Sequence, residues 1–137
     1  RMIEALNLIQ DHLFVGIFPA LQEAGIAALL DPKSEEAVAQ LNAVYDSRRD
    51  AFTQSAAKIG WQAFPSKGSF YAWMPVPEGY TSESFADLLL EKAHVAVAPG
   101  KGFGPAGDAY VRIGLLVEPE RLVEAVDRIA NLHLFNN

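Results

Sequence analysis

One arginine stands in the middle of an apolar stretch near the end of the chain. Arg112 lies at the centre of residues 110–115, YVRIGL, whose composition predicts a β-strand. Because side chains alternate along a strand, Val111 and Ile113 point to one face and Arg112 to the other. A guanidinium keeps its charge and is costly to remove from water unless an anion meets it. That anion is either an Asp or Glu of the protein itself, which would make a structural salt bridge, or a carboxylate of a ligand.

The loop before this strand is rich in glycine. Residues 102–107, GFGPAG, fit the G-x-G-x-x-G string of dinucleotide-binding proteins, but that motif should open a helix, and here a strand follows. Gly100 and Lys101 are not followed by Ser or Thr, which argues against a Walker phosphate loop. Glycines allow the backbone to approach a ligand closely, and Phe103 can wall a pocket. A plain connection between strands is the alternative, but the length of this loop, residues 100–108, favours a small-carboxylate site beside Arg112.

Composition narrows the classes of protein and of partner. A net charge of −6 and a pI near 4.9 argue against broad binding to nucleic acid or to anionic membranes. No apolar run approaches the roughly 18 residues that a membrane span needs. The chain has no cysteine, and His12, His94 and His133 are scattered, so no metal site is predicted. We expect a cytoplasmic protein with a small-molecule or protein partner.

The N-terminal residues predict three helices. The first ends near His12, the second runs from Pro19 to about residue 31, and the third covers residues 34–59. We expect Arg48 and Arg49, in the polar middle of the third helix, to lie on a solvated face. The chain starts in mid-helical pattern without a cap, as if it were cut from something larger. The segment between the first two helices is too apolar for a solvated loop and should pack on another domain or subunit; it contains Leu13, Phe14, Val15, Ile17 and Phe18.

The remaining residues alternate strands and helices. We predict strands at residues 61–64, 69–74, 95–98 and 110–115, a helix capped by Thr81 or Ser82 that ends near Ala93, and a last helix from Pro119. This order indicates an α/β or α+β domain with a short sheet covered by helices. Residues 1–33 lack the strands for a core of their own, so we assign them to a partner domain and residues 34–137 to the domain that contains the sheet.

Three segments together resemble a known family. Residues 96–116, AVAPGKGFGPAGDAYVRIGLL, are similar to the closing segment of class I aminotransferases of fold type I, which depend on pyridoxal phosphate. Residues 68–77, GSFYAWMPVP, resemble the G-x-F-Y-x-W segment of the same family, and residues 4–32 resemble the end of its large domain. The likeness is closest to diaminopimelate-aminotransferase-like enzymes. It implies a mostly antiparallel small domain, preceded by a long interdomain helix.

The resemblance also implies roles for individual residues. Arg112 would hold the α-carboxylate of an amino acid or 2-oxo acid substrate, with Phe103 and Gly102 closing over it. His12, Phe14 and Phe18 would approach the active site of the partner subunit in a homodimer.

The family's cofactor residues have no counterpart in this sequence. None of its lysines matches the motif that forms the Schiff base with pyridoxal phosphate; they are Lys33, Lys58, Lys67, Lys92 and Lys101. We therefore expect no catalytic and no cofactor-binding residue here, and a chain that is inactive without its large domain. The alternative is a free-standing α/β module that binds a small carboxylate or dimerises without catalysis.

Overall fold

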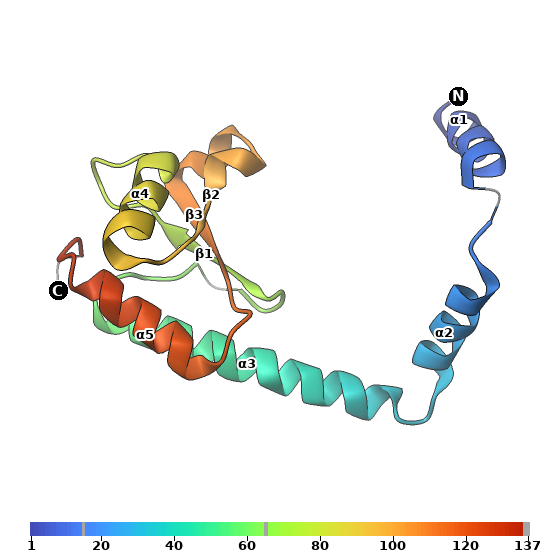
Figure 1. The fold of residues 1–137 in the computed structure, drawn as a ribbon, viewed down its shortest axis with the longest axis horizontal. Helices are drawn as coiled ribbons and strands as arrows, with labels where there is room; N and C mark the ends of the chain where they lie inside the picture. The colour runs from blue at the N-terminus through green and yellow to red at the C-terminus, as the bar shows by residue number, and fades with distance from the viewer. Residues whose placement is uncertain (15, 65, 136–137) are drawn as a thin grey trace. The chain divides into compact units, whose positions relative to one another are not determined.

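The computed structural model describes residues 1–14, 16–64 and 66–135, without the side chain of Phe14 (Figure 1). The chain divides into two units, residues 1–41 and residues 42–137, and each is described by itself. Within the described ranges, no helix is both long enough and apolar enough to cross a membrane.

The first unit contains helices without a core. Helix α1 spans Met2–Ile9 and continues as a π-helix, η1, at Gln10–Phe14, so the predicted first helix is confirmed with a change of winding at its end. Helix α2 spans Pro19–Leu30, as predicted, with Pro19 in its first turn. Neither α1 nor α2 has a buried residue. Their apolar side chains are therefore partly or fully exposed in the part of the chain that the structure describes.

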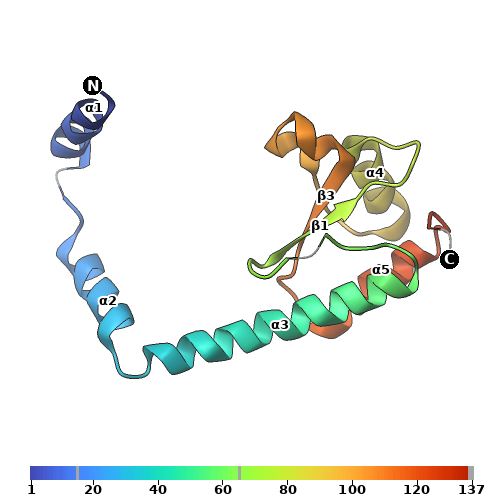
Figure 2. The ribbon, with the colours of Figure 1, turned by 180° about the vertical axis from the view of Figure 1, so that it is seen from behind.

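The sheet of the second unit is three-stranded and antiparallel. Its strands are β1 (Tyr71–Pro75), β2 (Ala98–Pro99) and β3 (Tyr110–Gly114), in the order β1-β3-β2 (Figures 1 and 2). Arg112 lies on the central strand, opposite Trp73 of β1 and Ala98 of β2. The predicted alternation along β3 is confirmed, because Val111 and Ile113 are buried and Arg112 is not. The predicted antiparallel sheet is confirmed as well.

One face of this sheet packs against helices and forms the core. Helix α3 spans Ser34–Lys58, α4 spans Ser82–Leu88 and continues as a π-helix, η2, at Leu89–Ala93, and α5 spans Pro119–Ala130. All three match the predicted helices closely. The largest core side chains come from α3, α4, η2, α5, the sheet and the residues that follow α3 and β3; they are Phe52, Trp61, Met74, Phe85, Leu89, Val111, Leu115, Val126 and Ile129. The opposite face of the sheet is left to Arg112 and its neighbours.

The predicted strand at residues 61–64 is wrong. This segment is irregular, and Phe64 N–H donates a ladder-like hydrogen bond to the Trp73 carbonyl at 3.0 Å. The N–H of Trp61 instead bonds to the Ala56 carbonyl at 3.0 Å, where Gly60 ends α3 in a left-handed conformation. Trp61 is therefore part of the helix cap, and its side chain is buried in the core.

The other strands are displaced or shorter than predicted. Strand β1 begins at Tyr71 rather than at residue 69, because Ser69 has a φ of 73° and belongs to the preceding turn. Strand β2 has two residues, Ala98 and Pro99, so it shares only Ala98 with the predicted 95–98 strand.

Arg48 is not on a solvated face, contrary to the prediction. Its side chain is 14% exposed, and its Nη2 lies 2.6 Å from Oε1 of Glu118, the residue before α5. Arg49 is more exposed and pairs with Asp46 and Asp50 on its own helix. The sequence could not separate these two arginines, because the position of α5 beside α3 decides which of them is covered.

Candidate functional site

The Arg112 guanidinium lies over two aromatic rings. Its Cζ is 4.0 Å from the ring centroid of Tyr71 and 4.3 Å from that of Phe103. Tyr71 comes from β1, paired with Gly114, so it is the diagonal neighbour of Arg112 across the strands. Phe103 comes from the glycine-rich loop between β2 and β3. The cation therefore contacts the π-systems of two rings, which attract it.

No carboxylate of the described residues neutralises Arg112. None of their Asp or Glu oxygens lies within 4.0 Å of its guanidinium nitrogens, whereas Arg48, Arg49, Arg121 and Arg128 all have such partners. The structural salt bridge that the sequence left open is thus not found in this part of the chain. The N–H groups of a guanidinium point outward in its plane, and that edge suits the two oxygens of one carboxylate.

The loop that supplies Phe103 consists of two 3-10 turns. The turns are η3 (Gly100–Phe103) and η4 (Pro105–Ala109), joined at Gly104, whose φ is 124°. A Cβ at Gly100 would collide with the Gly107 carbonyl and would lie 2.9 Å from Trp73 Cζ3, so the two turns are in direct backbone contact. Gly102 is exposed, and a Cβ there would meet nothing within 4 Å. Strand β3 follows this loop directly, whereas a dinucleotide-binding motif would open a helix.

Phe103, which contacts this cation, also lines an open aromatic pocket of about 380 Å³. Phe103 packs edge-on against Trp73 with ring centroids 5.6 Å apart, and Trp73 contacts Tyr110 in the same way at 6.2 Å. Phe64 and the turn at Gly107 complete the wall. Sequence reasoning singled out Phe103 alone. The alternation of Tyr71, Trp73 and Tyr110 with buried residues was the signal that could have added the rest.

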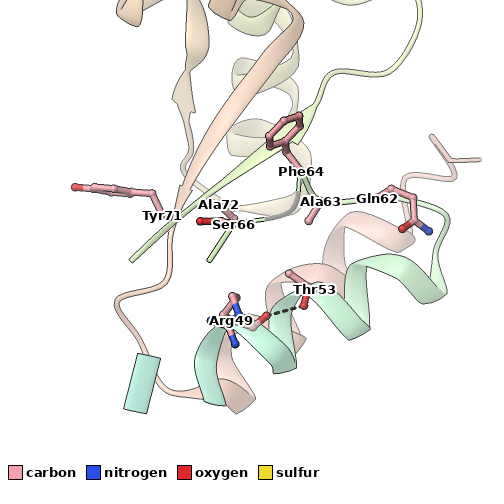
Figure 3. Close-up of a pocket in the computed structure, with 8 residues that line it drawn as sticks. All are labelled: Arg49, Thr53, Gln62, Ala63, Phe64, Ser66, Tyr71 and Ala72. Carbon is pink, nitrogen blue, oxygen red and sulfur yellow. Dashed lines mark hydrogen bonds between the residues drawn. The ribbon is translucent and has the colours of Figure 1, made fainter. Parts of the chain in front are cut away.

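A second pocket, of about 230 Å³, lies between α3 and β1 (Figure 3). Arg49 lines it, but its guanidinium is bonded to Asp50 and Asp46, and these hydrogen bonds raise the pKa of Arg49 above its ordinary value. Thr53 Oγ1 donates to the Arg49 carbonyl at 2.8 Å, and the Tyr71 ring points away from Arg49 (Figure 3). This cation is already neutralised, so the pocket is a weaker carboxylate site than Arg112.

The lysines do not fit a covalent site for an aldehyde cofactor. An imine-forming lysine needs a depressed pKa, usually through burial. Lys101 shows the opposite: a hydrogen bond at 2.6 Å to Glu83 raises the pKa of its ammonium group. All the other lysines are exposed. The described ranges also contain no cluster of three or more His, Cys, Asp or Glu suited to a metal ion.

The residues expected to approach a partner subunit lie in the first unit. His12 belongs to η1 and is exposed, and Phe18 precedes α2 with 69% of its surface exposed. The side chain of Phe14 lies outside the described part of the structure. Their predicted role stays a prediction.

Known proteins match this chain over nearly its full length. Residues 1–129 fit the family model described as aminotransferase class I and II. The L-glutamine–4-(methylsulfanyl)-2-oxobutanoate aminotransferase of Bacillus subtilis is 58% identical over 134 residues, which are 98% of this chain and 33% of that enzyme. The LL-diaminopimelate aminotransferase of Moorella thermoacetica is 45% identical, over 93% of this chain and 32% of that enzyme.

Solved structures give the same result. Substrate-bound BacF from Bacillus subtilis superposes with a TM-score of 0.85 at 44% identity, over 97% of this chain and 34% of BacF. An aminotransferase from Staphylococcus aureus has a TM-score of 0.85 at 40% identity, over 98% of this chain and 36% of that structure. The chain thus spans about a third of the length of its relatives. The sheet, the helices around it and these matches agree that the chain belongs to the class I and II aminotransferases, a pyridoxal-phosphate-dependent family of fold type I.

Proposed function

We propose that this chain supplies the carboxylate-binding side of an aminotransferase active site. The observation that carries the proposal is Arg112, a cation over two aromatic rings on a central strand with no carboxylate of the described residues within 4.0 Å of it. Its edge would bind the α-carboxylate of an amino acid or 2-oxo acid through two parallel hydrogen bonds. Holding the carboxylate there orients the substrate for proton removal at Cα. Phe103 and Gly102 would border the bound substrate.

The remainder of the active site would come from the large domain of the same protein. Because the lysines of this chain do not fit the cofactor, pyridoxal phosphate and the lysine that holds it would belong to that domain. The cofactor supplies the electron sink for the reaction when it is bound. The exposed apolar residues of α1 and α2 support an assignment of residues 1–33 to the large domain. By itself the chain would be inactive.

The first unit would also form part of an interface with a second subunit. Phe18 and Leu13 expose apolar surface in the first unit, and such surface is typical of an interface. In a homodimer, His12, Phe14 and Phe18 would approach the active site of the partner subunit. L-Glutamine, named for the Bacillus subtilis relative, is the first amino donor to test.

The test replaces Arg112 in the full-length protein. Arg112→Ala should remove about 2–5 kcal/mol of transition-state stabilisation. The kcat/KM for L-glutamine should therefore fall about 30-fold or more. The kcat/KM of Arg112→Lys should lie between those of the wild type and Arg112→Ala, because lysine keeps the charge but loses the bidentate contact. Arg121→Ala is the matched control, since Arg121 is exposed on α5 and pairs with Glu124. Unchanged kinetics for Arg112→Ala would show that the carboxylate binds elsewhere.

A further inference from the structure

The loop that carries Phe103 is tied to α4 by one buried hydroxyl. Ser82, the first residue of α4, is fully buried. Its Oγ donates to Asp108 Oδ1 at 2.7 Å, and its backbone N–H donates to the same oxygen at 3.2 Å. The Oγ also accepts a hydrogen bond from the Lys101 N–H at 3.3 Å. A single side chain therefore contacts both turns of the loop, η3 through Lys101 and η4 through Asp108.

These two contacts lie on either side of Phe103 in the chain. Its ring is 51% exposed, so burial alone does not fix it. The backbone contact between Gly100 and Gly107 closes the base of the loop, and the bonds of Ser82 fix that base against α4. Phe103 then projects from a rigid base over the guanidinium of Arg112.

Capping of α4 does not account for Ser82. Thr81 already caps the helix, with its side chain accepting from the Ser84 N–H and the Ser84 side chain accepting from the Thr81 N–H. The hydroxyl of Ser82 is left for the loop. The hydrogen bonds from Ser82 also lower the pKa of Asp108, so the acceptor is charged at neutral pH and the bonds are strengthened.

We infer that Ser82 and Asp108 are positioning residues for the carboxylate site. They hold the loop so that Phe103 stacks on Arg112 before substrate arrives, and the guanidinium edge is already oriented. This inference rests on the proposed function of Arg112. It adds two residues that lie outside the site itself and that act only through Phe103.

The first test is kinetic, in the full-length protein. Ser82→Ala and Asp108→Ala should each raise KM for the amino donor about 3- to 10-fold and leave kcat within about twofold, because the carboxylate is held in the ground state and transition state alike. Asp108→Asn keeps an acceptor oxygen for Ser82 and should restore most of the wild-type KM. A fall in kcat with unchanged KM would overturn the inference.

The second test separates positioning from general loss of stability. In a Phe103→Ala background, the added Ser82→Ala substitution should raise KM less than about 1.5-fold, since the ring that it positions is gone. Additive effects would show that Ser82 acts by another route and would overturn the inference.

Two further variants complete the design. Glu83→Ala removes the exposed pair with Lys101 next to Ser82 and should leave KM unchanged, because exposed ion pairs contribute little.

Arg112→Ala separates the two proposals. If it raises KM while Ser82→Ala and Asp108→Ala do not, the positioning role fails and the carboxylate assignment stands. If Arg112→Ala has no effect, the proposed function itself fails.

Discussion

Within the described residues, Arg112 contacts two aromatic rings and no counter-ion. Stacking on Tyr71 and Phe103 offsets part of the cost of placing a cation on a sheet, at about 0.5–2 kcal/mol for each ring. Such contacts leave the in-plane hydrogen bonds unused, whereas a salt bridge would consume them. The arrangement holds the side chain in one orientation and keeps its donors available.

The Tyr71 ring should therefore matter more than the Tyr71 hydroxyl. No hydrogen bond of the hydroxyl occurs within the described residues, so Tyr71→Phe should leave KM for the amino donor within about twofold in the full-length protein. Tyr71→Ala removes one stacked face and should raise KM by about 2- to 30-fold. Steady-state kinetics of the two variants check this. An equal loss for both would assign the role to the hydroxyl.

The sequence predicts the direction of the Arg112 side chain but not its contact with Tyr71. The alternation of apolar residues around Arg112 was enough to predict which way its side chain points. The Tyr71 contact could not be predicted, because it depends on the register that pairs Tyr71 with Gly114. A shift of one residue would have turned the ring to the other face of the sheet. The absence of a carboxylate near Arg112 within the described ranges likewise follows from packing and not from residue types.

At the scale of elements, the glycine-rich loop depends on two close backbone contacts. Gly100→Ala and Gly107→Ala should each lower the free energy of unfolding by about 1–3 kcal/mol, because the added Cβ meets backbone that cannot move aside. Gly102→Ala is the control in the same turn and should leave stability unchanged, since its Cβ would meet nothing. Urea unfolding of the three variants measures this. Equal stability of all three would mean that the turns are not in contact.

The bond between the loop and α4 should make stability depend on pH. The hydrogen bonds from Ser82 lower the folded-state pKa of Asp108 below its ordinary value of 3.8. When the pH falls below about 3.8, Asp108 is protonated in the unfolded state but stays largely charged in the folded state. The stability that the charged Asp108 contributes is therefore complete above about pH 5 and is lost as the pH falls further. Asp108→Asn cannot titrate and should lose less stability between pH 5 and pH 3. The free energy of unfolding of both proteins is measured by urea titration at each pH. An equal loss for wild type and Asp108→Asn would show that Asp108 does not cause the pH dependence.

Helices were easier to predict than strands, for a physical reason. Local signals set the ends of α3, α4 and α5: Pro119 begins α5, Thr81 caps α4 and Gly60 ends α3. The segment at residues 61–64 has strand composition, yet its hydrogen bonds and its Trp61 side chain are taken by the helix cap and the core. Whether an apolar segment joins a sheet depends on partners far away in the sequence.

At the scale of the molecule, the two units differ in how they bury apolar surface. Every buried hydrophobic residue of the described ranges lies at Phe52 or later. The first unit exposes a series of large apolar side chains: Met2, Ile3, Leu6, Leu8, Leu13, Ile17, Phe18, Leu21, Leu29 and Leu30. The predicted boundary lies at residue 33, directly before α3, and the observed division lies at residue 41, in the first turns of α3. The assignment of residues 1–33 to another domain stays a prediction.

Removal of residues 1–33 should change association without changing stability. Since the core lies in the second unit, a chain of residues 34–137 should melt within a few degrees of the 137-residue chain. The longer chain should form larger species as its concentration rises, because its exposed helices offer apolar surface. Light scattering with thermal melts followed by circular dichroism measures both properties. In the 137-residue chain, Leu6→Glu with Phe18→Glu should reduce association as the deletion does. A clean monomer of the 137-residue chain at high concentration would show that these helices need no partner.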